Sequence, residues 1–287
     1  MEQNVKMPVE VRGNSIENTF IIPVIFNYKG VDKCIETIYN YNENFRIYLI
    51  DQTEGGKCAY LQDKVHLYIK TCRNLGFAKA MNTGIVIAMR ESEYITLCND
   101  DVEFVHKDWF PRVKEYFIKR PEVLGLNPAS IKAFTDDRTK DWMPYKEKYT
   151  EEDIKYLFEP KKGANCEFSY HPDWFFEGAM MFCTVFPSRA FEIVGLLDEG
   201  FFPGSSEDYD WCRRCYALGY RMGHFNGAWL YHHWLTSKGQ FDWNSGEKEK
   251  YRAYPAFPDK WKTDEEPEPD IYGQKGAMDK PTLVVPL

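Results

Sequence analysis

The chain has 287 residues, of which 44% are hydrophobic, 28% charged and 16% aromatic. This composition is typical of a globular protein and excludes a mostly disordered chain and a fibrous one. The formal net charge is −8, which disfavours non-specific binding to nucleic acid or to an anionic membrane surface. Every apolar stretch is far shorter than the roughly 18 residues that suggest a membrane span, so we expect no integral membrane segment.

The eight cysteines indicate whether the protein belongs to an oxidising or a reducing compartment. Several lie inside apolar stretches, and the polar start of the chain lacks the pattern of a secretory leader. We therefore expect reduced thiols in a cytoplasmic protein. Cys212 and Cys215 are spaced as a CxxC pair, but no second pair follows at zinc-finger spacing, so we expect them to pack inside a helix.

The first part of the chain alternates between strand and helix patterns. Apolar runs predict strands at 19–27, 46–50, 65–69 and 94–98, and helical spacing of apolar residues predicts helices from Val31, at 78–89 and at 108–119, the last capped by Asp108. This alternation implies a parallel sheet with helices on both faces. Asn27, Asp51 and the segment 99–101 follow predicted strands, and ligands bind beyond such strand ends.

The second part is less regular. We predict an apolar strand region at 178–186, helices at 188–194 and 209–218, and a strand at 228–231. Thr150 and Asp153 resemble a capping box before a short helix. The predicted organisation is an N-terminal extension (1–18), one domain (19–240) with a variable polar segment (131–176), and a proline- and charge-rich, partly mobile C-terminal extension (241–287).

Asn99-Asp100-Asp101 is the first candidate for chemistry. If strand geometry persists, Asn99 and Asp101 point to one side and Asp100 to the other. Two oxygen-bearing side chains at a strand end suit Mg²⁺ or Mn²⁺, with substrate phosphates and water completing the coordination. An ordinary Asn-Asp turn is the alternative.

Three further segments carry candidate residues. Glu207, Asp208 and Asp210 cluster at a predicted helix start, where the helix dipole favours negative charge; an ordinary acidic helix start is the alternative. In Arg73 to Gly84, a glycine at the strand-to-helix turn allows a ligand to approach the backbone, and the helix start favours phosphate. His232-His233 ends a predicted strand and offers a metal ligand or a structural histidine pair.

The order and spacing of these segments resemble the GT-A-fold glycosyltransferases, especially the large inverting family two, from about Thr19 to Gly239. The resembling segments are the opening strand 21–28, Asp51, the run Asn74-x-Gly76-x-Ala78-x-x-x-Asn82-x-Gly84, the DxD-like Leu97 to Val102, the stretch from Gly178, the ED motif at Glu207-Asp208, and His232 with Ser237. The resemblance implies an α/β GT-A (Rossmann-like) fold with a mostly parallel sheet, an acceptor-side insertion and a C-terminal extension.

The resemblance also implies a function. The chain is expected to be a metal-dependent inverting transferase that uses a nucleoside-diphosphate sugar, UDP being the first expectation, and an unknown glycan or glycoconjugate acceptor. It implies Asp208 as general base with Glu207 near the acceptor, and Asp101, Asn99 and His232 as ligands of Mn²⁺ or Mg²⁺. The implied nucleotide-sugar contacts are Asn27, Asp51, Arg73, Asn74, Gly76, Lys79, Asn82, Asn99, Asp100 and Gly178.

The chain departs from the family pattern at two of these positions. Asn99 replaces the first acid of DxD, and Lys79 stands where a small residue is common. The processive-synthase motif Gln-x-x-Arg-Trp is missing, which implies a non-processive enzyme. The competing functions are a nucleotidyltransferase on a related sheet, a glycoside hydrolase, and a protein that binds a glycan or nucleotide sugar without turnover.

Overall fold

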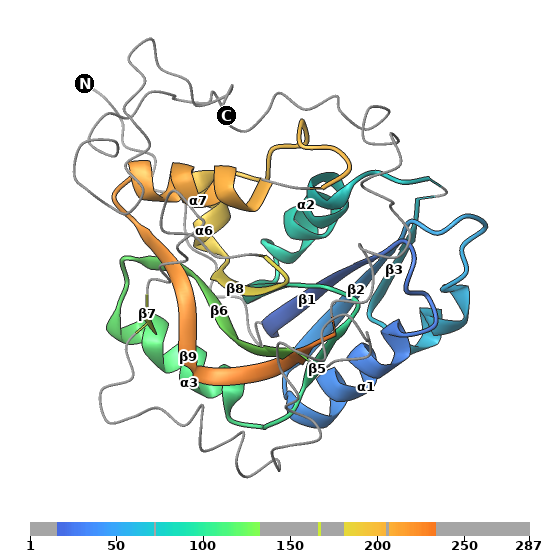
Figure 1. The fold of residues 1–287 in the computed structure, drawn as a ribbon, viewed down its shortest axis with the longest axis horizontal. Coiled ribbons are helices and arrows are strands. Elements are labelled where there is room, and N and C mark those ends of the chain that lie inside the picture. Colours follow the sequence, from blue (N-terminus) through green and yellow to red (C-terminus); the bar gives the residue numbers. More distant parts are fainter. Residues whose placement is uncertain (1–15, 72, 133–165, 168–180, 205–206, 234–287) are drawn as a thin grey trace, which may run out of the picture.

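The computed structural model describes residues 16–71, 73–132, 166–167, 181–204 and 207–233 (Figure 1). Its strands form one nine-stranded sheet in the order β3-β2-β1-β4-β8-β6-β9-β5, with β7 paired to β9 beside this path. The strands are β1 (Ile16–Val24), β2 (Phe45–Asp51), β3 (Leu67–Lys70), β4 (Ser92–Cys98), β5 (Val102–Phe104), β6 (Val123–Lys132), β7 (Cys166–Glu167), β8 (Cys183–Pro187) and β9 (Arg221–His232).

The sheet is mixed but most of its strands share one direction. β3, β2, β1 and β4 are parallel neighbours, as the alternating pattern predicts. β8 runs antiparallel to both β4 and β6, whereas β6 and β9 are parallel to each other. β5 and β7 run antiparallel to β9. The α/β fold class with a mostly parallel sheet is therefore confirmed.

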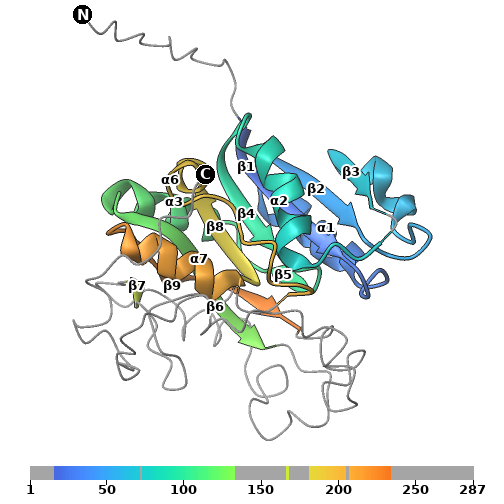
Figure 2. The ribbon, with the colours of Figure 1, turned by 90° about the horizontal axis from the view of Figure 1, so that it is seen from above.

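Helices cover both faces of the sheet (Figures 1 and 2). The helices α1 (Val31–Tyr41) and α3 (Trp109–Lys119) pack on one face, and α2 (Phe77–Ala88), α6 (Arg189–Val194) and α7 (Glu207–Ala217) pack on the other. A 3-10 helix, η1 (Ala59–Lys64), connects β2 to β3. Each face has its own buried apolar cluster, so the sheet is enclosed on both sides, as parallel sheets generally are.

Strand β1 lies between these two clusters. Phe20 and Ile22 belong to the cluster under α1 and α3, whereas Ile21 belongs to the cluster under α2. Gly84 allows α2 to approach β1 closely, because a Cβ atom at this position would lie 2.6 Å from Cγ2 of Ile21. The alternation of side chains along a buried strand thus joins both cores through one segment.

Both predicted ends of the first strand differ from the structure. β1 begins at Ile16, inside the predicted N-terminal extension, and ends at Val24 rather than Asn27. It ends early because the Asn27 carbonyl accepts hydrogen bonds from the amides of Gly30 and Val31, which closes a turn. Asp108 precedes α3 as predicted, but its side chain makes no capping hydrogen bond and instead pairs with His106 and Arg112. The segment predicted to be helical after Thr150 lies outside the described residues.

The cysteines are consistent with the expected reduced thiols. Six that the structure describes are free and buried: Cys34, Cys58, Cys98, Cys183, Cys212 and Cys215. Cys212 and Cys215 belong to the cluster under α7, which confirms their predicted packing role. Within the described ranges, the helices lack the combination of length and apolarity that crossing a bilayer requires.

Candidate active site

The DxD-like segment forms a turn at the end of β4. Strand geometry stops at Cys98, and residues 99–101 lead directly into β5. Asp100 and Asp101 are both buried, with exposures of 6% and 4%. The predicted alternation of these three side chains required continued strand geometry, and this condition is not met. The turn is held on one side by the Asn27 side-chain amide, which donates to the Asp100 carbonyl at 3.1 Å.

Asp101 and His232 lie together, as the resemblance implies. The Asp101 Oδ1 atom is 3.2 Å from His232 Nε2, and both side chains are buried. The antiparallel pairing of β5 with β9 brings them together, since Val102 is directly opposite His232. His233 instead contacts Glu103, with Nε2 2.5 Å from Oε1. Of the two adjacent histidines, His232 is therefore the one that lies beside Asp101.

The donor set of Asp101 and His232 fits a divalent cation. A carboxylate oxygen and an imidazole nitrogen are ligands for Mn²⁺, and phosphate oxygens and water can supply the others. Asn99, which is half-buried, lies two residues before Asp101 in the same turn. Among the described residues, no cluster of three or more His, Cys, Asp or Glu side chains is suited to hold a metal ion.

The turn concentrates negative charge in a buried place. Burial raises the pKa of Asp100 well above its ordinary value, the neighbouring charge of Asp101 raises it further, and the hydrogen bond with Asn27 lowers it. A cation at this turn would offset the repulsion between the two carboxylates.

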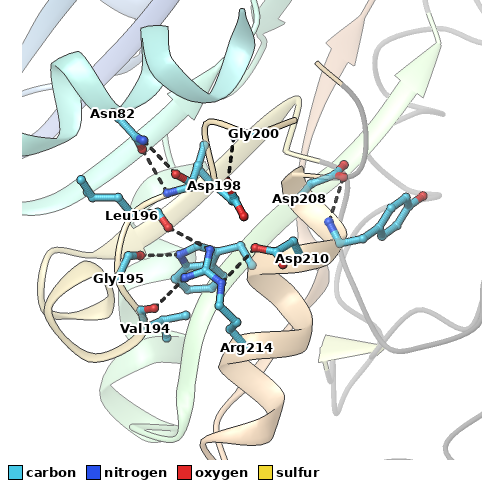
Figure 3. A network of polar contacts seen from close by, with 12 residues as sticks. Asn82, Val194, Gly195, Leu196, Asp198, Gly200, Asp208, Asp210 and Arg214 are labelled. Carbon is cyan, nitrogen blue, oxygen red and sulfur yellow. Dashed lines mark hydrogen bonds and ion pairs between the residues drawn. The ribbon is translucent and has the colours of Figure 1, made fainter. Parts of the chain in front are cut away.

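Asp208 lies in the first turn of α7 (Figure 3). Its chain neighbour Glu207 is buried. Burial raises the pKa of Asp208 to about 6, and hydrogen bonds from the backbone amides of Tyr209 and Met181 partly oppose this shift. A carboxylate with this pKa is a stronger base than an ordinary aspartate and is still ionised at neutral pH.

Met181 and Phe182 connect the two parts of the site. The Met181 amide bonds the Asp208 carboxylate, and the ring of the next residue, Phe182, stacks on His232 with centroids 4.5 Å apart. The Phe182 carbonyl also accepts a hydrogen bond from the Asn99 amide at 2.7 Å. Two consecutive residues before β8 therefore touch both the predicted metal-binding turn and the predicted base.

Asp51 lies at the end of β2 as predicted, but its carboxylate is fully buried and bonded within the chain. It accepts four hydrogen bonds: from the amide and hydroxyl of Thr53, the amide of Cys58 and the hydroxyl of Tyr68. Asp51 thus shapes the 52–58 loop.

Sequence reasoning missed Gln52, whose Oε1 accepts a hydrogen bond from the Leu75 amide at 2.7 Å and joins this loop to the 73–76 turn. Its position immediately after the β2 run was the available signal.

At Gly76, where sequence reasoning expected a ligand to approach the backbone, Phe202 and Pro203 of the protein itself lie against the glycine. Its φ is +79°, and a Cβ atom there would lie 2.9 Å from the Phe202 ring and 3.0 Å from the Pro203 carbonyl. The Phe77 amide, at the start of α2, donates to that same carbonyl at 2.7 Å. The Asn74 side chain bonds the Gly76 amide and shapes the turn, and Arg73 is exposed beside it.

Lys79 and Asn82 point from α2 toward the segment 197–199. Lys79 Nζ lies 2.9 Å from Glu199 Oε2, and Asn82 bonds both Leu197 and Glu199. Figure 3 shows the Asn82 side chain directed from α2 toward this segment. The structure therefore joins these two predicted donor contacts to the segment that precedes the ED motif. Gly178, the remaining predicted contact, lies outside the described residues.

Two solved glycosyltransferase structures share this fold. The mannosyltransferase PcManGT from Pyrobaculum calidifontis, in complex with GDP-Man and Mn²⁺, is 14% identical with a TM-score of 0.51; the match covers 78% of this chain and 58% of that one. GalNAc-T7 with UDP, GalNAc and Mn²⁺ is 10% identical with a TM-score of 0.56, over 78% of this chain and 45% of the other. This chain thus spans about half the length of these neighbours. No protein of curated function matches the sequence.

The family comparison is more direct. The model of the Glycosyl transferase family 2 matches residues 19–183, which is more than half of the chain and includes Asp51, the 73–84 segment and the turn at 99–101. The chain belongs to glycosyl transferase family 2.

Proposed function

We propose that this glycosyltransferase moves a sugar from a nucleoside-diphosphate sugar to an acceptor hydroxyl, with inversion and with the help of a divalent cation. The observation that carries the proposal is that Met181 and Phe182 contact both the predicted base and the predicted cation site. These neighbours contact the Asp208 carboxylate on one side and the ring of His232, Asp101's partner, on the other. A base and a cation site at one place are what transfer from a diphosphate donor requires.

Asp101 and His232 would hold the cation, with Asn99 assisting. A cation bound there supplies positive charge that neutralises the growing charge on the diphosphate leaving group. Mn²⁺ is the first candidate, because the two solved neighbours are complexes with Mn²⁺, and Mg²⁺ is the alternative.

Asp208 would take the proton of the acceptor hydroxyl as the new bond forms, with Glu207 near the acceptor. Its raised pKa supports this role, because a base near the operating pH is ionised and still accepts a proton readily. A single general base without a covalent nucleophile implies one displacement, and one displacement inverts the anomeric carbon.

The donor side is proposed to lie along the strand ends. Its residues are Asn27, Asp51, Arg73, Asn74, Gly76, Asn99, Asp100 and Gly178. Asp51 would act here by holding the shape of the 52–58 loop, since its own oxygens already have four donors. UDP remains the first nucleotide to test, and GDP follows because the neighbour PcManGT is a complex with GDP-Man. The acceptor is proposed to be a glycan or glycoconjugate.

Hydrolysis of UDP-glucose, UDP-GlcNAc and GDP-mannose with Mn²⁺ tests this proposal. The wild-type protein is expected to release a nucleoside diphosphate from one of them and to lose this activity in EDTA. Asp208→Asn keeps the shape of the side chain and should lower turnover by about 10²–10⁴-fold while donor affinity is retained. A protein that binds a donor but releases no diphosphate would be a non-catalytic binder. Unchanged turnover in Asp208→Asn would reject the assigned base.

A further inference from the structure

The segment Gly195–Gly204, called here the 195–204 loop, lies between α2 and α7. It leaves α6, passes the N-terminal part of α2 and leads toward α7, which carries Asp208 (Figures 1 and 2). The loop therefore separates the helix of the predicted donor segment from the helix of the predicted base.

Helix α7 holds the beginning of this loop. The Arg214 guanidinium donates to the carbonyls of Val194 and Leu196, at 2.7 and 2.8 Å, and pairs with the fully buried Asp210 at 3.0 Å. The indole of Trp211 donates to the Gly195 carbonyl at 2.8 Å. Figure 3 shows these groups gathered along α7, with Asp208 at the N-terminal end of the same helix.

Helix α2 holds the middle and the end of the loop. Asn82 Oδ1 accepts from the Leu197 amide at 3.0 Å, and its Nδ2 donates to the Leu197 carbonyl at 2.9 Å and to Glu199 at 3.2 Å. Near the loop's end, a Cβ atom on Gly204 would lie 2.9 Å from the Phe77 Cβ, so the two backbones are in close contact. The loop thus connects α2 to α7 through specific bonds at both sides.

Asn82 has no hydrogen left to offer a sugar. A side-chain amide carries two hydrogens, and both are directed at the loop. The residue is also only 5% exposed. A direct contact with the donor would require it to release Leu197 or Glu199.

We propose that Asn82 is a positioning residue: through the 195–204 loop it fixes the place of Asp208 relative to the donor, and it does not bind the donor itself. This inference rests on the proposed function. Misplacement of a reacting group by about 1 Å can lower the rate by 10²-fold, so a loosened loop should reduce turnover without weakening donor binding.

Asn82→Ala removes all three bonds to the loop. Glu199→Ala removes one of them, together with the ion pair to Lys79, at a side chain that is 42% exposed. Thr83→Ala is the matched control on the same helix, because within the described part of the chain the Thr83 hydroxyl bonds the Lys79 carbonyl of α2 itself and not the 195–204 loop. The affinity for the donor is measured by calorimetry with Mn²⁺, using UDP-glucose and GDP-mannose, and kcat is measured for hydrolysis of the same donors.

The expected result is a fall in kcat of about 10- to 100-fold for Asn82→Ala and a smaller fall for Glu199→Ala, with dissociation constants within about twofold of wild type. Thr83→Ala should match wild type in both quantities. If Asn82→Ala does not fold, the Glu199→Ala variant decides the question by the same comparison. Weakened donor binding with unchanged kcat, or wild-type kcat in a folded variant, would overturn the positioning role. Absence of hydrolysis by the wild-type protein would instead reject the proposed function and this inference with it.

Discussion

The ring of Phe182 stacks on the imidazole of His232 with an angle of 10° between their planes. This contact holds the imidazole plane while His232 Nε2 lies 3.2 Å from the Asp101 carboxylate. A ligand whose orientation is fixed before the metal arrives loses less freedom on binding, which is the general role of residues around a metal site. The predicted cation site is therefore shaped by the segment that precedes β8 as well as by its own ligands.

The two adjacent histidines give a direct test of that site. His232→Ala should raise the Mn²⁺ concentration needed for half-maximal turnover by about tenfold or more, because loss of even a supporting residue costs 10–100-fold in metal affinity. His233→Ala is the control, since its ring contacts Glu103 instead. The measurement is a Mn²⁺ titration of hydrolysis at saturating donor. Equal shifts in both variants would contradict the assignment of His232 as the ligand.

The pH dependence of turnover should report Asp208. Because burial raises its pKa to about 6 and a base must be ionised, kcat is expected to fall as the pH drops below about 6 and to approach a tenfold loss per pH unit. The measurement is kcat at saturating donor across this range at two Mn²⁺ concentrations. A limb that moves with the Mn²⁺ concentration would belong to the metal site instead.

The raised pKa of Asp208 also predicts how the Asp208→Asn substitution changes the thermal stability of the protein. A carboxyl whose folded-state pKa lies above its ordinary 3.8 stabilises the fold in its protonated form, and this contribution is lost as the pH rises through about 6. Asp208→Asn removes a partly buried charge at pH 7, so its Tm should be no lower than that of wild type. Asp210→Asn should lower the Tm, because Asp210 is fully buried against Arg214. Thermal unfolding of both variants checks this contrast.

Asp51→Asn tests the loop that Asp51 organises. The substitution places an NH₂ group among four donors and leaves at least one of them unpaired, which costs about 1–3 kcal/mol for a buried group. Both the Tm and the affinity for a UDP- or GDP-sugar should fall. Asp63→Asn, on the exposed side of η1, is the control. A lower donor affinity at unchanged Tm would mean that Asp51 contacts the nucleotide directly.

Gly84→Ala tests the contact between α2 and β1. The new methyl group would overlap Cγ2 of Ile21, and a β-branched side chain in a strand has few ways to move aside. Overpacking of this kind costs about 1–3 kcal/mol, which should appear as a lower Tm. Thr83→Ala on the same helix is the control. Equal Tm values for the two variants would show that the contact relaxes without cost.

The sequence was most informative where local pattern decides the structure. β1, β2, β4, α1 and α2 follow from apolar runs and helical spacing, because each buries a face that its own residues define. β5 has three residues, too few for a periodic signal, and β6 contains Gly125 and Pro128, which disfavour strands. β6 forms because β8 and β9 pair with it on both sides. These partners are distant in the sequence, so the local residue pattern of β6 does not predict them.

The candidate site likewise has features that the sequence predicted and features that it did not. The resemblance to a family predicted the meeting of Asp101 with His232, which the structure contains. It did not predict that the Asp51 carboxylate would accept hydrogen bonds from Tyr68 and from its own loop. It also did not predict that Gly76 would lie against the Phe202 ring. Those partners depend on how distant segments pack, so residue type and spacing alone leave them open.

The position of β8 has a consequence for the growing chain during synthesis. β8 lies between β4 and β6, although both are translated before it. Until residues 183–187 leave the ribosome, the edge of β4 and the edge of β6 that β8 will cover have no partner strand. Open strand edges invite pairing with other chains, and non-local pairing of this kind is slow. The nascent chain is therefore expected to need protection by chaperones through this interval, and its resistance to protease should rise only once β8 has emerged.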